Sequence, residues 1–256
     1  MAFSFKKIIA ALFGFTLVIL VHELGHFSFC KLFHIATPTF SIGFGPALLQ
    51  KKIGATNFVL AAIPFGGYVE IAGMEQDEPP YSPHSFAAKP YYQKGLVILG
   101  GILFNLLFAL FVFIMLRFTL KTTEAATAEK LTDADQNDEE SLHLTSTQKE
   151  RAELIKSYGR FIGPFGIFSL LGESTTQGFR FYWALLALLS LNLAVINMIP
   201  LPVFDGGQLL LYTLEALGLH ITLAVKNMIF TLSWILIIAL ITLISTFDIL
   251  RIFRKS

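Results

Sequence analysis

The chain has 256 residues, of which 54% are hydrophobic and only 14% are charged, and its formal net charge is +1. Soluble domains carry about 25% charged residues, so these side chains are too few to cover a surface that faces water. The near-neutral charge offers no basic footprint for nucleic acid, and the single cysteine excludes a disulfide framework within one chain. The composition therefore predicts a protein whose solvent is the lipid bilayer, and not a disordered chain or an ordinary cytosolic enzyme.

Four apolar stretches are long enough to cross the roughly 30 Å of hydrocarbon, which takes about 20 helical residues. The first begins like a secretory signal, but it continues into His22 and Glu23 without a cleavage site, so we interpret it as a retained helix. We expect an α-helical polytopic membrane protein with about four transmembrane helices. The predicted spans are residues 8–30, 96–116, 181–204 and 227–247.

The segment Thr56–Ala72, between the first two spans, has a different pattern. It is rich in β-branched and aromatic residues and is interrupted by Pro64, Gly66 and Gly67. This pattern fits two short extended pieces joined by a turn. Because the segment is also apolar, we expect a short membrane-associated segment resembling a β-hairpin.

Residues 121–160 hold 15 of the 37 charged side chains and are predicted to form a polar extramembrane loop. We divide the chain accordingly into three parts. They are residues 1–117 with the first two helices and the β-like loop, 118–160 with the polar loop, and 161–256 with the last two helices.

His22, Glu23 and His26 form an HExxH motif. Positions four apart share one face of a helix, so both imidazoles can point at one metal ion, with Glu23 as general base on a metal-bound water. Three ionisable residues within a predicted span need compensation, which a metal would provide. The alternative is a helix that ends at Val21, with both histidines merely interfacial.

Asp205 is the best candidate for the third protein ligand that a catalytic zinc site requires. It follows a span broken by Pro200 and Pro202 and precedes two glycines, so the helix can open there and aim a carboxylate inward. The alternative is a helix C-terminus followed by a turn. We expect one zinc ion per chain.

The two motifs together resemble the site-2 protease family of intramembrane zinc metalloproteases, whose patterns are HExxH and NxxPxxxxDGG. The second pattern is matched by Asn197–Gly207. Other stretches resemble the bacterial regulator-of-sigma-E protease branch, although that branch usually has proline at the position of Leu103. These stretches are residues 44–46, 63–74, 100–105 and 163–167.

This resemblance implies an enzyme of regulated intramembrane proteolysis, which hydrolyses peptide bonds within transmembrane segments of single-span proteins or signal-peptide remnants. His22, His26 and Asp205 would bind zinc, and Glu23 would be the base and proton shuttle. Asn197 is expected to position the substrate backbone. Its alternative role is a hydrogen bond to a neighbouring helix.

The resemblance also points to a strand edge that captures the unwound substrate by strand addition. Residues 56–72 are the candidate for this edge, with Gly66, Gly67 and Tyr68 as candidate substrate-binding residues. The alternative is that the two glycines only form a turn.

The bacterial branch usually carries PDZ modules where this chain has residues 118–160, which are too few for one. An accessory subunit, or prior cleavage of the substrate, would then control access. The family implies a multi-pass protein of the bacterial inner membrane, with both termini outside. Lysines and arginines outside the spans number 13 on the side of the termini and 6 on the other, which favours termini in the cytoplasm. We adopt the family orientation, because a long charged loop can cross regardless of its charge.

Two other functions fit part of the pattern. A catalytically silent relative would bind transmembrane helices without cutting them, but it has no chemical need for both histidines, Glu23 and Asp205. A metal-handling membrane transporter should show paired broken helices in two similar halves. The sequence contains one broken helix and no internal repeat.

Overall fold

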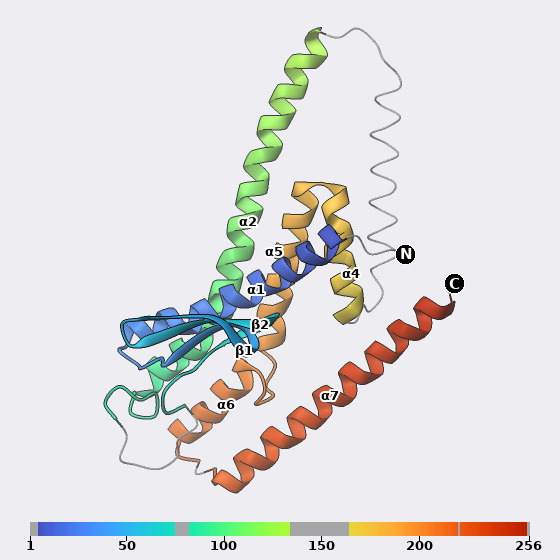
Figure 1. The fold of residues 1–256 in the computed structure, drawn as a ribbon. Coiled ribbons are helices and arrows are strands. Elements are labelled where there is room, and N and C mark those ends of the chain that lie inside the picture. Colours follow the sequence, from blue (N-terminus) through green and yellow to red (C-terminus); the bar gives the residue numbers. More distant parts are fainter. Residues whose placement is uncertain (1–4, 75–81, 134–163, 220, 255–256) are drawn as a thin grey trace.

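The predicted fold class is confirmed by a computed structural model that describes residues 5–74, 82–133, 164–219 and 221–254 (Figure 1). Four of its helices are long and apolar enough to cross a membrane, namely Phe5–Leu32, Tyr91–Phe118, Phe179–Asn197 and Ala224–Thr246. The elements in chain order are α1 (Phe5–Leu32), β1 (Thr39–Ile53), β2 (Thr56–Val69), α2 (Tyr91–Asp133), α4 (Pro164–Ser174), η1 (Thr175–Gln177), α5 (Phe179–Asn197), α6 (Asp205–Ala216) and α7 (Leu223–Arg254).

The third transmembrane helix is shorter than its sequence suggests. Helix α5 ends at Asn197, so the expected continuation to Phe204 is wrong. Pro200 and Pro202 lack the backbone N–H that a helix needs, and the chain turns before a separate helix, α6, begins at Asp205. This break places Asp205 in the first turn of a new helix.

Strands β1 and β2 form a hairpin whose turn lies at Gly54, where the backbone has a φ of +61°. The predicted β-hairpin-like segment is confirmed, but the division of residues 56–72 into two short pieces joined by a turn is wrong. Residues 56–69 form one long bent strand, and their partner is β1. From Phe44 to Ile53 every residue of β1 is exposed, so burial imposes no alternation that would reveal this strand in the sequence.

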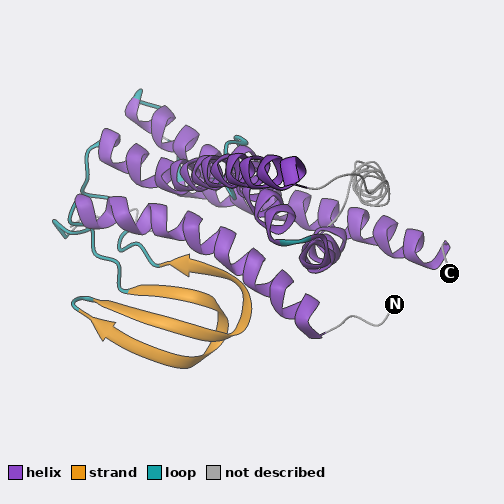
Figure 2. Ribbon diagram, turned by 90° about the horizontal axis from the view of Figure 1, so that it is seen from above, coloured by secondary structure: helices purple, strands orange, loops and turns teal. Residues whose placement is uncertain are grey.

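The bends allow the start of β1 to pair twice. Residues 39–42 lie opposite 57–60 and also opposite 67–69, where Phe40 faces Val69 in the antiparallel register. The far end of β1, from residue 47 to 53, pairs with the start of β2. Residues 67–69 therefore form an edge of the sheet, on the side of helix α1 (Figure 2).

Helix α1 holds the hairpin beside the membrane-spanning region. The Thr16 hydroxyl, in the middle of α1, donates a hydrogen bond of 2.7 Å to the Pro64 carbonyl. Nearer the end of the helix, the Phe27 ring meets the rings of Phe40 and Phe58 edge to face. These contacts support the prediction of a membrane-associated β segment.

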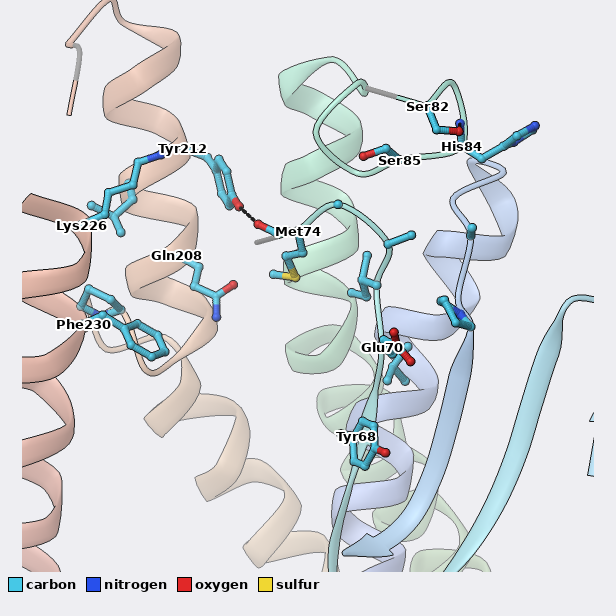
Figure 3. Close-up of a pocket in the computed structure, with 18 of the residues that line it drawn as sticks. Tyr68, Glu70, Met74, Ser82, His84, Ser85, Gln208, Tyr212, Lys226 and Phe230 are labelled. Atoms are coloured by element: carbon cyan, nitrogen blue, oxygen red, sulfur yellow. Dashed lines mark hydrogen bonds between the residues drawn. The ribbon is translucent and has the colours of Figure 1, made fainter. Parts of the chain in front are cut away.

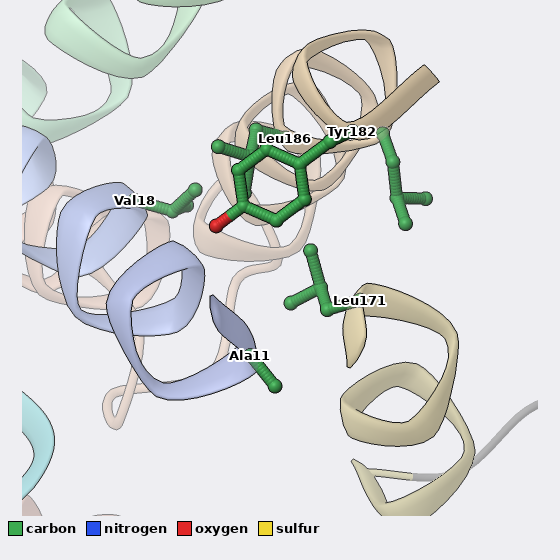
Figure 4. Packing of buried hydrophobic residues seen from close by; sticks show 6 residues of the cluster. Ala11, Val18, Leu171, Tyr182 and Leu186 are labelled. Atoms are coloured by element: carbon green, nitrogen blue, oxygen red, sulfur yellow. The ribbon is translucent and has the colours of Figure 1, made fainter. Parts of the chain in front are cut away.

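Helices α1, α4 and α5 meet in a buried apolar cluster (Figure 4). The Tyr182 hydroxyl is satisfied there by the Ala10 carbonyl at 2.8 Å. Near the start of α1, Lys7 forms an ion pair of 2.8 Å with Glu173 of α4. The residues at the centre of the cluster are Ala11, Val18, Leu171, Tyr182, Leu185 and Leu186.

Helices α1 and α2 cross with their backbones nearly in contact. A Cβ atom at Gly100 would lie 2.7 Å from the Gly25 carbonyl oxygen, and one at Gly25 would collide with the Gly100 carbonyl. Small residues are the usual means of bringing membrane helices this close. The crossing places α2 directly behind the HExxH face of α1.

The remaining helices frame this core. Helix α7 stands apart from the bundle in Figure 1 and is almost entirely exposed in the isolated chain. Helix α2 extends beyond its apolar part to Asp133, so the beginning of the predicted polar loop is helical. Residues 134–160 of that loop lie outside the described residues, and the three-part division of the chain stays a prediction.

Candidate metal centre

The structure brings three predicted ligands together from two distant parts of the chain. His22 and His26 project from α1, and Asp205 projects from the first turn of α6. The Nε2 atoms of the histidines are 3.1 Å apart, and the Asp205 Oδ2 atom lies 3.2 Å from that of His22 and 3.5 Å from that of His26. Within the described residues this is the one group of three or more such side chains that could hold a metal ion.

These distances fit a tetrahedral zinc ion. Zinc binds histidine nitrogen and carboxylate oxygen at about 2.0–2.2 Å, so two ligands of one tetrahedron lie about 3.3 Å apart. The three observed separations scatter around this value.

The hydrogen bonding of His26 also indicates that this residue is a metal ligand. Its Nδ1 atom lies 2.8 Å from the Val97 carbonyl oxygen, which can only accept, so Nδ1 carries the proton. In the neutral ring Nε2 then offers a lone pair toward the other ligands. A backbone carbonyl that orients a ligating imidazole in this way is common around metal sites.

Asp205 is the most telling member of the group. Its Oδ2 atom is buried and accepts no hydrogen bond from the described residues, although both Nε2 atoms lie within 3.5 Å. A buried carboxylate without a donor is costly, whereas a cation between the three acceptors would satisfy all of them. The donor set and its burial therefore fit zinc.

Two glycines allow Asp205 to reach this position. A Cβ atom at Gly206 would collide with the Met198 carbonyl, and one at Gly207 would collide with Leu201. The first turn of α6 thus lies directly against the chain that follows α5. The sequence-based expectation of close backbone approach at this point agrees with the geometry.

Glu23 lies beside the ligands and contacts the sheet. Its Oε2 atom accepts a hydrogen bond of 3.1 Å from the backbone N–H of Val69. Because Val69 lies on the edge of the sheet, this bond ties the candidate base to that edge. The arrangement places a carboxylate, a metal site and a strand edge around one point.

The predicted substrate-binding residues divide into two groups. Gly66, Gly67 and Tyr68 lie on or next to the edge of the sheet near Glu23. Asn197 is buried at the end of α5, and its amide nitrogen donates to the Leu193 carbonyl of the same helix at 3.0 Å. Contact of these residues with a substrate stays a prediction.

A cleft of about 1080 Å³ begins beside this edge and separates it from α6 and α7 (Figure 3). One wall carries Tyr68, Glu70 and Met74, and the opposite wall carries Gln208 and Phe230. The Tyr212 hydroxyl bridges the two walls with a hydrogen bond of 3.2 Å to the Met74 carbonyl. The cleft gives an extended peptide room beside the strand.

Sequence reasoning missed two supporting features of the centre. The Val97 carbonyl orients His26, but a backbone group leaves no signature in a sequence. Gly101 lies against both imidazoles, since a Cβ atom there would be 2.5 Å from His26 Nε2. The pair Gly100 and Gly101 is visible in the sequence, but its contact with the histidines depends on the crossing of α1 and α2.

Comparison with known proteins supports the geometry. The sequence profile of peptidase family M50 matches residues 10–240. A protein of Fusobacterium nucleatum, named as an inferred zinc metalloprotease, is 26% identical, and the alignment covers 93% of this chain and 97% of the relative. That alignment runs over 333 positions, so the relative contains residues for which this chain has no counterpart.

Other bacterial relatives match over a shorter part of the chain. Inferred zinc metalloproteases of Chlamydia trachomatis and Clostridium perfringens are 42% and 46% identical over 40% and 42% of this chain. The matched regions amount to only 18% and 31% of those two proteins.

Proposed function

Because this chain belongs to peptidase family M50 and is a zinc metalloprotease of the membrane, we propose that it hydrolyses peptide bonds inside the bilayer. Its substrates would be transmembrane segments of single-span proteins or remnants of signal peptides, as in regulated intramembrane proteolysis.

The observation that carries this proposal is the depth of the metal centre. His22 lies ten residues before the end of α1, which is about 15 Å along the helix axis. The helix itself is about 42 Å long and exceeds the roughly 30 Å of hydrocarbon. A peptide that reaches the three ligands would then enter the membrane-spanning part of the protein.

The residues of the site supply the parts of a hydrolysis. His22, His26 and Asp205 would hold one zinc ion per chain, which supplies a water of lowered pKa and polarises a carbonyl group. Glu23 would take a proton from the attacking water while the water oxygen bonds to the carbonyl carbon. When the C–N bond breaks, Glu23 would pass that proton to the leaving amine nitrogen.

The edge of the sheet is suited to hold the substrate in an extended form. A helical substrate hides its carbonyls in its own hydrogen bonds and must unwind before attack. Val69 turns its N–H away from β1, so Gly67, two residues earlier, turns its backbone groups the same way. An unwound substrate would add to this edge as a further strand, with its scissile bond near Glu23.

The cleft beyond the edge would receive the polar flank of the substrate that adjoins its transmembrane segment. Glu70 and Gln208 line this space from opposite walls, and Ser82 and Ser85 also line it. This mixture of polar and apolar side chains suits a juxtamembrane peptide. Without a PDZ module, an accessory subunit or prior shortening of the substrate would limit access.

We place the protein in the bacterial inner membrane, because the relatives are bacterial and four helices can span a bilayer. Its partners would be the bilayer itself and single-span membrane proteins. Its net charge of +1 gives no reason to expect a nucleic acid as a partner.

The decisive experiment compares the wild-type protein with Glu23→Gln on a model single-span substrate in liposomes. The proposal predicts a product band for the wild type, no product for the variant, and about one bound zinc per chain in both. Glutamine keeps the size of the side chain but cannot accept the proton.

Each other outcome has a defined meaning. Equal cleavage by both proteins would show that Glu23 is not the base. Zinc in both proteins without cleavage of any single-span substrate tested would favour the silent relative. Absence of zinc from both would contradict the metal centre itself.

A further inference from the structure

Asn105 contacts the metal centre from behind. It lies on α2, one turn after Gly101, and is completely buried. Its Nδ2 atom is 3.2 Å from the Nδ1 atom of His22. Its backbone carbonyl accepts a hydrogen bond of 3.0 Å from the Ser190 hydroxyl of α5, so the residue lies between α1, α2 and α5.

The orientation of the Asn105 amide decides which nitrogen of His22 carries the proton. An amide nitrogen can only donate, so with Nδ2 toward the ring, Nδ1 must accept and the proton of the neutral ring sits on Nε2. That Nε2–H then faces His26 Nε2, 3.1 Å away. A protonated Nε2 cannot bind a metal ion.

Rotation of the Asn105 amide by 180° moves the proton of His22 from Nε2 to Nδ1. The rotation brings Oδ1, which has no hydrogen-bond partner among the described residues, to the position near Nδ1. Oδ1 then accepts the Nδ1–H of His22, and Nε2 is left with a lone pair for the metal. The Val97 carbonyl already imposes the same tautomer on His26.

We propose that Asn105 is the positioning residue for His22, and that its amide oxygen faces Nδ1 when zinc is bound. The two amide orientations correspond to two tautomers of His22. In one, its Nε2–H is hydrogen-bonded to His26 Nε2, and in the other its Nε2 lone pair is free to bind the metal. Asn105 touches neither substrate nor metal and acts only through His22. The inference concerns metal binding and stands apart from where the peptide is cut.

Two substitutions separate the role of acceptor from that of packing. Asn105→Asp keeps an oxygen near Nδ1 and removes the donor, whereas Asn105→Leu keeps the approximate size and removes both. We expect the zinc dissociation constant of the Leu variant, measured by competition with a chelator in detergent, to rise about 10- to 100-fold. The Asp variant should bind zinc as tightly as the wild type or more tightly.

Ser190→Ala is the matched control, because this hydroxyl binds the backbone of Asn105 and not its amide. It should leave the zinc dissociation constant unchanged. Thermal unfolding of the metal-free proteins shows whether any variant has lost its fold. If the Leu variant does not fold, the Asp variant still tests the proposal. A loss of zinc binding by the Asp variant would overturn it.

Nitrogen-15 NMR of histidine-labelled protein reads the tautomer directly. In the zinc-loaded wild type and in the zinc-loaded Asp variant, His22 should carry its proton on Nδ1. In the zinc-free wild type the proton should move to Nε2. A ring bound to zinc through Nδ1, or a Leu variant with wild-type zinc affinity, would contradict the inference even if proteolysis were normal.

Discussion

The close fit of Gly101 beneath the two imidazoles yields a quantitative prediction. In Gly101→Ala the new Cβ atom would lie 2.5 Å from both His22 Cε1 and His26 Nε2, whereas ordinary contact begins near 3.4 Å. The rings must therefore move by about 0.9 Å, while metal–ligand distances tolerate about ±0.2 Å. We expect the zinc dissociation constant to rise at least 10- to 100-fold, the loss typical when support for a ligand fails.

Gly95→Ala is the matched control for this substitution. Gly95 lies on the same helix, but its new Cβ atom would meet only the Leu209 side chain, at an ordinary 3.5 Å. Zinc affinity is measured for both variants in detergent by chelator competition, alongside thermal unfolding without metal. Wild-type affinity in Gly101→Ala, or an equal loss in Gly95→Ala, would refute the reasoning from geometry.

Two further predictions concern the hairpin. Gly67→Ala should reduce cleavage while zinc content stays at the wild-type level, because its Cβ atom would lie 2.6 Å from the Ser41 carbonyl and displace the edge strand. The control is Gly54→Asn in the open turn, where asparagine tolerates the positive φ, so this variant should remain active. Unchanged cleavage by Gly67→Ala would argue against the edge of the sheet as the substrate site. Thr16→Val removes the hydrogen bond to the Pro64 carbonyl and should lower stability by about 0.6 kcal/mol, the average for such bonds in membranes. Unfolding in mixed detergents measures this loss, and a stability equal to the wild type would show that the bond contributes nothing.

Sequence patterns predicted the part of the site that rests on local periodicity. The two histidines share a helix face because their spacing of four is close to one turn. Asp205 could be predicted as a ligand because prolines and glycines indicate a helix break within an apolar stretch. Hydropathy alone could not find where α5 ends, since the residues after Asn197 remain apolar outside the helix.

The parts that sequence reasoning missed depend on contacts between distant segments. Strand β1 is exposed along most of its length, so it lacks the alternation that identifies a half-buried strand. The Val97 carbonyl and the Asn105 amide acquire their roles only when α2 crosses α1. A single chain without relatives beside it contains no signal for such a crossing.

The origin of the three ligands in two distant parts of the chain has a consequence for biosynthesis. His26 and Asp205 are separated by 179 positions. At 5–20 residues per second, roughly 10–35 s pass between the synthesis of the first two ligands and that of the third. A nascent chain therefore enters the membrane as an inert protein. The metal centre is complete only after α6 has brought Asp205 to the two histidines, so the order of synthesis itself delays the protease until its own insertion is nearly complete.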